Sequence, residues 1–260
     1  MQKESTKFQN SLIFEGMTSI RAAIAAIDMG VSDRRIQKIY YDKYKLRKIA
    51  KEVGYFRAVS DKYGFELCES TGEEIEKMTL GSSHGGIVAL FSERTVPHLD
   101  DSLILPHGFY AMLQGIEDPY NFGYAIRSLY AAGCDGIIVG ERNWLSAAGV
   151  LARSSAGASE LIPTFSSDES SAVRIFKRCG YNVVCADINT DEELGKTELP
   201  YPIFLIIGGE RRGINAEILA MADRLVKIPY ERDFRASLSA ASATTMFAYE
   251  IMRQKRSLGK

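Results

Sequence analysis

The sequence has few residues of the kinds that build metal sites and disulfides. Its 260 residues include three histidines and four cysteines. There is no CxxC pair and no zinc-finger spacing to a histidine around Cys68, Cys134, Cys179 or Cys185. Neither a disulfide framework nor a metal site is therefore expected, and the cysteine usage fits a reducing cytoplasm.

Long apolar runs and an excess of one charge are also missing. The opening MQKESTKFQN has no signal-peptide apolar region, and the longest apolar runs, such as PIFLII, are far too short to cross a bilayer. We therefore expect a soluble, cytoplasmic protein with no membrane partner. Because the formal net charge is -1, any nucleic-acid-binding surface must be local.

Two glycine-rich nucleotide signatures are absent as well. The paired glycines of IIGGERRGIN, residues 206–215, match neither GxGxxG nor GxxxxGK[ST]. A nucleotide-dependent metabolic enzyme is one alternative for the strand and helix pattern described below, but it has no phosphate-binding loop to support it.

Two prolines and two aspartates interrupt the periodic pattern at TVPHLDDSLILPHG, residues 95–108. We expect a small α/β domain at 1–96, a linker at 97–107 and a second domain at 108–260. In the first domain, MTSIRAAIAAIDMG predicts a helix with Thr18 or Ser19 as its cap and Gly30 as its stop. The other elements expected there are strands at 36–42, 65–69 and 86–92, a helix at 45–54, and a helix that starts with the capping box of Thr71 and Glu74.

The second domain alternates strands with helices. Its expected strands lie at 109–116, 136–140, 182–187, 203–209 and 225–230, and its expected helices at 122–132, 150–157, 170–180, 215–222 and 241–254. Continuous apolar strands such as IFLII predict a mostly parallel sheet covered on both faces. In such sheets ligands bind beyond the carboxyl ends of the strands.

Three polar clusters follow strands of this domain. In the first, DPYNFGYAIRSLYAAG at 118–133, we expect Asn121 to cap a helix that carries Arg127 and stops at Gly133. One interpretation of Arg127 is an exposed side chain on a helix flank. Because its neighbours are small or apolar and leave little polar face, the other interpretation is that it anchors a phosphate or carboxylate.

The other clusters are IIGGERRGIN and VKIPYERDFRASLSAASATTMFAYE, residues 226–250. In the former, Gly208 and Gly209 would let a ligand approach the backbone, and Glu210 adds a charge where the sheet ends. In the latter, Ser237 is explained as well by capping the helix that follows. Taken singly, none of the clusters indicates a function.

Taken together and in this order, the clusters resemble the three motifs of the SpoU/TrmH family of RNA ribose 2'-O-methyltransferases, in the SPOUT superfamily. The matching series are N-x-G-x-x-x-R at 121–127, I-I-G-G-E at 206–210, and the I-P and S-L pairs within 228–238. SSAGASE at 154–160 is similar to a further segment of that family. EGMTSIRAAI at 15–24 and HGGIVA at 84–89 are similar to the substrate-binding domain commonly fused ahead of the catalytic one.

The resemblance implies an N-terminal RNA substrate-binding domain and a parallel-sheet SPOUT domain whose C-terminal part forms a trefoil knot. It implies S-adenosylmethionine as the cofactor, bound by Gly208, Gly209, Ile228, Ser237 and Leu238. The catalytic residues that it implies are Asn121, Arg127, Glu210, Ser237 and Ser239. The expected activity is 2'-O-methylation of a ribose in structured rRNA or tRNA, by a homodimer with its active site near the subunit interface.

Two positions depart from the family pattern. The family usually has Asn where this chain has Ser239, and HQG where this chain has HGG at 84–86. A serine hydroxyl reaches less far than an amide, so a non-catalytic RNA-binding protein that has kept the cofactor pocket is the alternative. The HGG change bears on the choice of RNA.

One segment of the first domain interleaves basic residues with tyrosines. Basic groups contact phosphates and tyrosines stack on unpaired bases, so we expect RNA there. A solvated helix face with its tyrosines in the core is the alternative. The segment is DRRIQKIYYDKYKLRKIAK, with Arg34, Arg35, Lys38, Tyr40, Tyr41, Lys43, Tyr44, Lys45, Arg47, Lys48 and Lys51.

Overall fold

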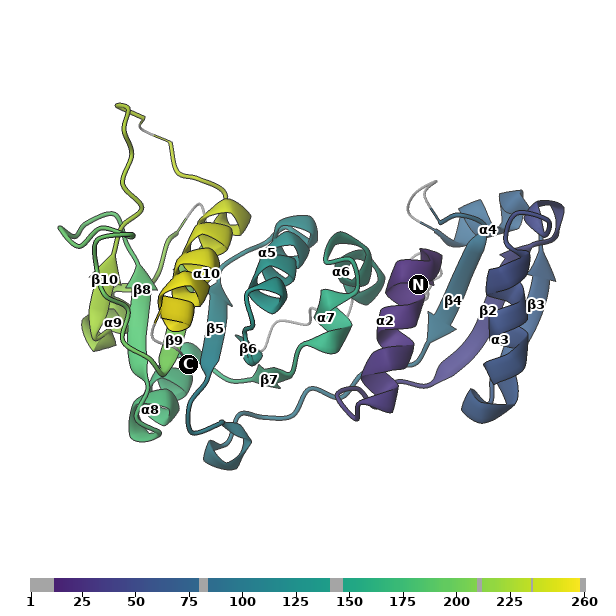
Figure 1. The fold of residues 1–260 in the computed structure, drawn as a ribbon, viewed down its shortest axis with the longest axis horizontal. Coiled ribbons are helices and arrows are strands. Elements are labelled where there is room, and N and C mark those ends of the chain that lie inside the picture. The colour runs from purple at the N-terminus through teal and green to yellow at the C-terminus, as the bar shows by residue number, and fades with distance from the viewer. Residues whose placement is uncertain (1–11, 80–83, 141–146, 210–211, 235, 258–260) are drawn as a thin grey trace, which may run out of the picture. The chain divides into compact units, whose positions relative to one another are not determined.

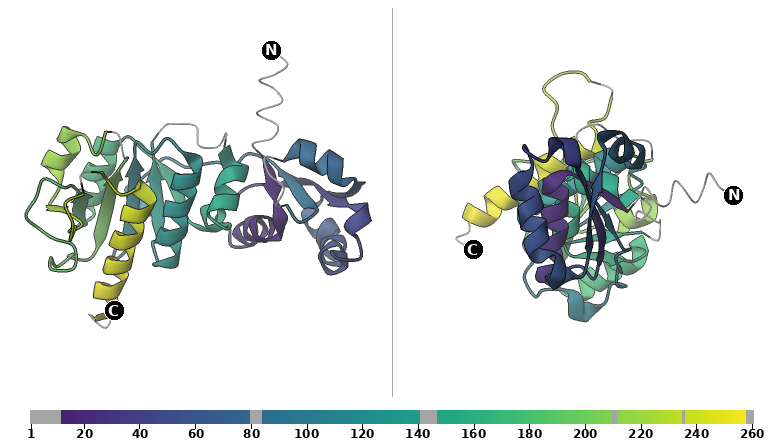
Figure 2. Two further views of the ribbon diagram at one scale, coloured as in Figure 1. Left: turned by 90° about the horizontal axis from the view of Figure 1, so that it is seen from above. Right: turned by 90° about the vertical axis from the view of Figure 1, so that its right-hand side faces the viewer.

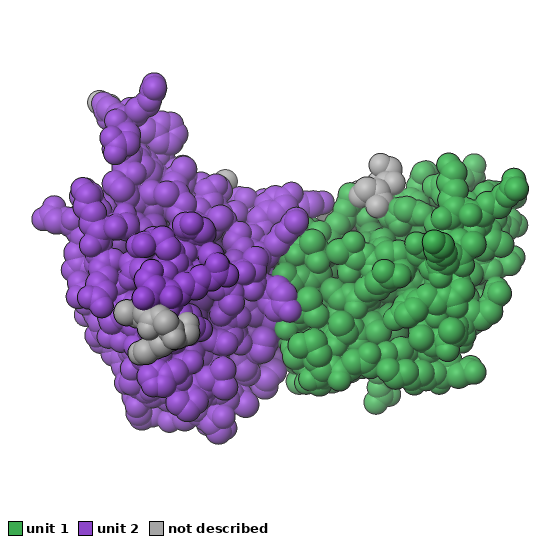
Figure 3. All heavy atoms as spheres, viewed as in Figure 1, with its two compact units in different colours: residues 1–95, 143–161 green, residues 96–142, 162–260 purple. Residues whose placement is uncertain are grey.

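The computed structural model describes residues 12–79, 84–140, 147–209, 212–234 and 236–257. The chain divides into two compact units, unit 1 with residues 1–95 and 143–161, and unit 2 with residues 96–142 and 162–260 (Figure 3). These units differ from the domains expected from sequence in two places. Residues 97–107 belong to unit 2, and residues 143–161 belong to unit 1.

Unit 1 contains a four-stranded mixed sheet in the order β1-β4-β2-β3 (Figure 1). Strands β2 and β3 are parallel, and β4 runs antiparallel to both β1 and β2. The strands are β1 (Ile13–Glu15), β2 (Ile36–Asp42), β3 (Glu66–Ser70) and β4 (Ile87–Phe91). The helices are α2 (Gly16–Asp28), α3 (Ala50–Tyr63), α4 (Gly72–Met78), α6 (Ala148–Ser154) and α7 (Ala158–Leu161), with a 3-10 turn η1 (Lys43–Lys45). Strand β1 was not expected from the sequence.

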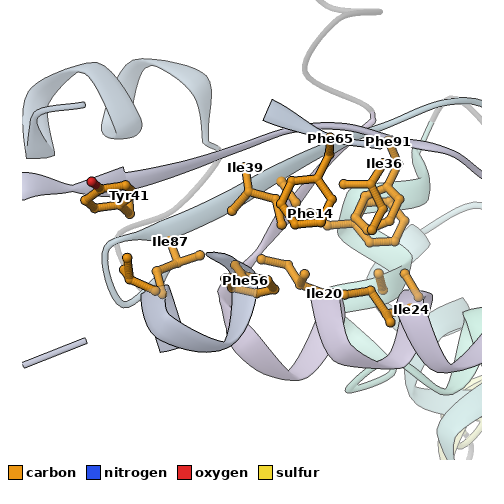
Figure 4. Close-up of a cluster of buried hydrophobic side chains, with 14 of the residues drawn as sticks. Phe14, Ile20, Ile24, Ile36, Ile39, Tyr41, Phe56, Phe65, Ile87 and Phe91 are labelled. Carbon is orange, nitrogen blue, oxygen red and sulfur yellow. The ribbon is translucent and has the colours of Figure 1, made fainter. Parts of the chain in front are cut away.

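The core of unit 1 lies between this sheet and its helices. Figure 4 shows Ile20 and Ile24 of α2 and Phe56 of α3 directed towards Phe14 and Ile39 of the sheet. All five side chains are almost completely buried. The isoleucines at helical spacing in the sequence therefore lie on the face of α2 that packs against the sheet.

The ends of the helices in unit 1 confirm some predictions and correct others. Helix α2 begins at Gly16 with Glu15 as its N-cap residue, so the assignment of the cap to Thr18 or Ser19 was wrong. Gly30, with φ of 70°, follows the end of α2 as expected. The capping box of Thr71 and Glu74 is confirmed at the start of α4.

Helix α3 begins at Ala50, five residues later than the predicted start at 45. Non-helical turn residues precede it and connect it to the 3-10 turn η1, formed by Lys43–Lys45. This turn is capped by Asp42, whose side chain accepts a hydrogen bond from the Tyr44 amide.

Residues of α6 and α7 join unit 1 through buried polar contacts. Arg34 Nε donates to Glu160 Oε2 at 2.7 Å, and only 2% and 3% of the two side chains are exposed. Arg94 Nη1 donates to the backbone oxygen of Ser159 at 3.0 Å. At Gly157 an added Cβ would lie 2.2 Å from the Cβ of Ala22, so α7 can approach α2 only with glycine at this position.

Unit 2 contains a six-stranded sheet in the order β10-β8-β9-β5-β6-β7, and every neighbouring pair is parallel. This confirms the parallel sheet expected from sequence. The strands are β5 (Phe109–Gln114), β6 (Gly136–Val139), β7 (Thr164–Ser166), β8 (Asn182–Ala186), β9 (Ile203–Gly208) and β10 (Arg224–Val226). The helices are α5 (Pro119–Ala131), α8 (Glu169–Arg178), α9 (Ala216–Met221) and α10 (Ala240–Ser257), with a 3-10 turn η2 (Asp101–Leu103).

Helices cover both faces of this sheet (Figures 1 and 2). Phe204 and Ile206 of β9 pack in a core with Phe176 of α8 and Ile218 of α9. Successive side chains of a strand point to opposite faces, so Ile203, Leu205 and Ile207 face the side of α5 and α10. Burial on both faces explains why β9 is a continuous apolar run.

Two helix caps in unit 2 differ from prediction. Asp118 caps α5 by accepting from the amides of Tyr120 and Asn121, so Asn121 is not the cap and lies in the first turn. At α10 the capping side chain is that of Ser239, which accepts from the Ser242 amide at 3.1 Å. Ser237 lies before this cap. Within the described part of the chain, no helix is long and apolar enough to span a membrane.

Candidate functional site

A cavity of about 330 Å³ lies in unit 2 where three neighbouring strands end. Its lining includes Ala186 at the end of β8, Gly208 at the end of β9, and Val226 at the end of β10. The start of α10 closes it with Ala240, Ala243 and Phe247. We call this the strand-end cavity. Its position matches the expectation for ligand sites in parallel sheets, and its volume falls in the range of small-molecule sites.

The two glycines at the end of β9, Gly208 and Gly209, allow the backbone of one wall to pack closely. A Cβ at Gly208 would lie 2.4 Å from the carbonyl carbon of Gly213, and a Cβ at Gly209 would lie 2.4 Å from the backbone oxygen of Gly115. Both obstacles are backbone atoms, which cannot rotate away. Glycine is therefore needed here for packing, whether or not a ligand binds.

The opposite wall comes from the segment between β10 and α10, which stands out from unit 2 in Figure 1. Ile228, Ser237 and Leu238 of this segment line the cavity. The Leu238 amide donates to the Tyr230 hydroxyl at 3.1 Å, which ties the two ends of the segment together. The strand-end cavity thus contains all five residues expected from the resemblance to bind a cofactor: Gly208, Gly209, Ile228, Ser237 and Leu238.

Sequence reasoning missed the charged and polar groups of this cavity. Asp187 and Asn189 follow β8, Arg212 lies in the turn after β9, and Lys227 directly follows β10. Asp187 Oδ1 accepts from the Asn189 backbone amide and from its side-chain amide, both at 3.1 Å. The available signal was the position of Asp187 directly after a buried strand. Such a set can bind a ligand that has both hydroxyl donors and an anionic group.

The predicted catalytic residues are not brought together in the single chain. Arg127 is exposed on α5 and is not among the residues that line the strand-end cavity, and neither are Asn121 and Ser239. Of the predicted catalytic set, Ser237 lines the cavity. Glu210 lies outside the described residues.

Helix α5 nevertheless packs along α10, the helix that closes the cavity. The hydroxyl groups of Ser128 and Thr245 are 2.7 Å apart and join the two helices. Large side chains are exposed on both helices: Tyr120, Tyr124 and Tyr130 on α5, and Met246 and Tyr249 on α10. We call these five residues the α5–α10 surface.

The basic and tyrosine residues of the segment at 33–51 in unit 1 divide into buried and exposed ones. Arg34 and Tyr41 are buried, so these two residues belong to the core and cannot contact RNA. By contrast, 79% of Tyr44 is exposed, and the basic side chains around it are exposed too. The exposed basic residues of the segment are Arg35, Lys43, Lys45, Arg47, Lys48 and Lys51.

No group of three or more potential metal ligands of the His, Cys, Asp or Glu type occurs among residues that the structure describes.

The fold and the strand-end cavity together define a parallel-sheet α/β protein with a small-molecule site at the carboxyl edge of its sheet. A sequence model of the SpoU rRNA Methylase family matches residues 108–249, which is more than half of the chain. The chain therefore belongs to the SpoU methylase family of rRNA and tRNA methyltransferases, which confirms the resemblance.

Individual relatives cover most of the chain. YacO of Bacillus subtilis, assigned to the TrmH family of tRNA/rRNA methyltransferases, is 26% identical over 91% of this chain and 95% of its own length. The 23S rRNA (guanosine-2'-O-)-methyltransferase RlmB of Shewanella oneidensis is 28% identical over 75% of this chain and 81% of its own.

Solved structures share the fold. A crystal structure of an RNA 2'-O ribose methyltransferase superposes with a TM-score of 0.78 at 22% identity, covering 95% of this chain and 90% of the other. AviRb of Streptomyces viridochromogenes, solved with AdoMet, gives a TM-score of 0.76 at 21% identity, covering 96% and 97% of the two chains.

Proposed function

We propose that this protein transfers a methyl group from S-adenosylmethionine to the 2'-hydroxyl of a ribose in rRNA or tRNA. Membership of the SpoU methylase family supports RNA methylation. The ribose as acceptor is supported by the similarity to RlmB, named as a guanosine-2'-O-methyltransferase. The observation that carries the proposal is the strand-end cavity, whose lining includes the five residues, at the end of β9 and after β10, that the resemblance assigns to the cofactor: Gly208, Gly209, Ile228, Ser237 and Leu238.

The residues of the strand-end cavity fit S-adenosylmethionine. Gly208, Ile228 and Leu238 all belong to the lining, and their backbone polar groups can meet the adenine and methionine parts. Asp187 can accept from ribose hydroxyls, and Lys227 can bind the carboxylate. When bound, the cofactor would supply a methyl group on a sulfonium.

In this proposal Arg127 binds the phosphate beside the target ribose and stabilises the alkoxide that develops there. A guanidinium carries a positive charge and a fork of N–H donors with no acceptor, so it suits an electrostatic role better than that of a general base. Glu210 or a phosphate is the proposed proton acceptor, and Asn121 and Ser237 position the ribose. Ser239 retains the capping role at α10 that an asparagine would also perform, so the departure from the family pattern preserves the local fold.

We further propose that the chain acts as a homodimer, paired through the α5–α10 surface. Exposed tyrosines and methionine on two packed helices are what a buried interface uses, since Tyr and Met are enriched at the centre of interfaces. In the single chain, no residue of α5 is among those that line the strand-end cavity. Such pairing would bring Arg127 of the partner subunit towards this cavity. Sedimentation of a Tyr124→Glu variant as a dimer would contradict this arrangement.

The proposal also includes a knot in the fold, a role for unit 1 and a location in the cell. We propose, from membership of the SpoU methylase family, that the C-terminal part of the chain forms a trefoil knot. An experimental chain trace without a threaded segment after β9 would exclude it. We assign unit 1 to RNA binding and the protein to the cytoplasm, where rRNA and tRNA occur.

Transfer of label from methyl-labelled S-adenosylmethionine into total RNA tests the activity. A 2'-O-methyl group prevents alkaline cleavage of the adjacent phosphodiester, so the label should remain in alkali-resistant dinucleotides. Arg127→Ala should abolish most of the transfer, whereas Arg174→Ala on α8, another exposed arginine, should not. Cofactor and RNA binding without any transfer would instead favour a non-catalytic RNA-binding protein.

A further inference from the structure

A second cavity, of about 430 Å³, lies entirely within unit 1. It is bounded by the start of α2, the start of α3, the turn before β4, and α6. The residues that decide its chemistry are Glu15, Ile49, Glu52, His84, Ile87 and Arg153. We call it the α2 cavity. The methyl-transfer proposal makes no use of it.

The walls of the α2 cavity are partly apolar. Ile49 and Ile87 are almost fully buried and contribute aliphatic atoms to the lining. The volume is in the range of pockets that enclose small organic molecules. Both features suit a planar heterocycle.

His84 supplies a hydrogen-bond donor of fixed identity. Its Nδ1 accepts from the Gly86 amide at 3.1 Å, so the proton of the neutral ring is on Nε2. Burial, with a smaller effect of nearby Lys45, lowers the pKa of His84 and favours this neutral form. His84 is 2% exposed, and Nε2 makes no other hydrogen bond with the described residues. The group that it can offer a ligand is therefore Nε2–H.

The charges of the α2 cavity disfavour a phosphate. Arg153 Nη1 donates to Glu15 Oε2 at 2.8 Å, so this guanidinium already has a carboxylate beside it. Glu52 adds a second carboxylate to the lining, and it has no ion-pair partner among the described residues. Two carboxylates with one guanidinium repel an anion but can accept hydrogen bonds from a neutral ligand.

The rim of the α2 cavity is basic. Lys43, Lys45, Arg47 and Lys48 are exposed and immediately precede Ile49 in the lining. The side chain of Lys45 passes beside the HGG turn, where a Cβ on Gly86 would lie 3.1 Å from Lys45 Cδ. A polyanion that follows these cations would reach the mouth of a cavity whose interior suits a neutral base.

From this arrangement we infer that the α2 cavity takes an unpaired guanine base of the RNA substrate. Guanine presents O6 and N7 as acceptors, which match the donors of His84 and Arg153. Its N1–H and N2–H₂ groups are adjacent donors, which match the two oxygens of the Glu52 carboxylate. Recognition of a splayed base by its edge is the usual way in which proteins read single-stranded RNA. The inference rests on RNA being the substrate, as proposed above.

Binding of four fluorescent oligouridylate decamers to the full chain tests this. They carry G, A, C or U at one central position. The guanine decamer should bind about tenfold more tightly than the other three, which corresponds to about 1.4 kcal/mol. Glu52→Gln should remove this preference, whereas Glu73→Gln, an exposed glutamate of α4, should keep it.

Several results would overturn the inference. Equal affinity for the four decamers would exclude base recognition, and a full guanine preference in Glu52→Gln would place it elsewhere. Guanosine monophosphate should compete far more weakly than the guanine decamer, because it lacks the phosphates that the basic rim contacts. Competition at equal concentration would assign the cavity to a free nucleotide instead of RNA.

The same variants separate this inference from the proposed function. Glu52→Gln should raise the KM for RNA in the methyl-transfer assay and leave the affinity for S-adenosylmethionine unchanged. If the wild-type chain transferred no methyl group but showed the guanine preference, the proposed function would fail and the inference would stand.

Discussion

Replacing Glu160 by glutamine should destabilise the protein strongly, although Glu160 lies outside the strand-end cavity. The Arg34 and Glu160 side chains are almost fully buried, and Arg34 Nε donates to Glu160 Oε2 at 2.7 Å. Arg34 also donates to the backbone oxygen of Ser92 at 2.7 Å and lies over the Phe14 ring. The variant would leave a buried guanidinium with neutral partners only.

Loss of one member of a buried ion pair costs about 3–5 kcal/mol. Glutamine keeps one acceptor oxygen, so we expect the lower end, about 3 kcal/mol, and a fall in melting temperature of about 10 °C. Differential scanning calorimetry and urea unfolding measure both quantities.

A matched control is available in the same unit. Lys38 and Glu66 form an ion pair at 2.8 Å with 44% and 63% of their side chains exposed. Glu66→Gln should change stability little, because water screens exposed pairs. A second variant, Arg34→Met with Glu160→Leu, should recover most of the lost stability, since apolar residues can replace a buried pair. Equal effects of Glu160→Gln and Glu66→Gln would refute this reasoning.

Three further predictions follow from single positions. Gly209→Ala should lower both the stability of the protein and its affinity for S-adenosylmethionine, because the alanine Cβ would meet the Gly115 backbone. Calorimetry measures both quantities, and an unchanged affinity would remove Gly209 from the cofactor site. Ser239→Ala should cost about 1 kcal/mol through loss of the α10 cap, whereas Ser239→Asn should be nearly neutral in urea unfolding. Burial raises the pKa of the Cys185 thiol to about 12, so this thiol stays protonated at pH 8. Iodoacetamide should therefore alkylate the half-buried Cys68 and Cys179 before the buried Cys134 and Cys185. Early labelling of Cys185, detected by mass spectrometry, would contradict its burial.

Much of the fold could be predicted from periodicity. The apolar run of β9 predicted a parallel sheet covered on both faces, and the spacing of the isoleucines predicted helix α2. Strands β1 and β7, each three residues long, were missed because so short a segment shows no period. Short strands are defined by their partners in the sheet, which lie far away in sequence.

Helix caps show where local rules conflict. Asp118 and Asn121 are both good N-cap residues. Proline favours the first position of a helix, so Pro119 indicates that the residue before it, Asp118, is the cap. Ser237 and Ser239 offered the same choice at α10. There the hydrogen bond to the Ser242 amide selects Ser239.

The candidate site was predictable only in part. Resemblance identified the five residues that line one cavity, because the motifs occur where strands end. It could not show that Arg34 is a core residue, since its partner Glu160 lies 126 positions away. Nor could it show that Arg127 and the strand-end cavity are separate in one chain, because this depends on how the helices pack.

A crystal structure of the protein with S-adenosylhomocysteine is the most direct test of the central claim. We expect the ligand in the strand-end cavity, against Gly208, Ile228 and Leu238, with an Arg127 side chain from one of two paired subunits facing its sulfur. A ligand bound elsewhere, or a sulfur with no Arg127 from either subunit nearby, would contradict the proposed function.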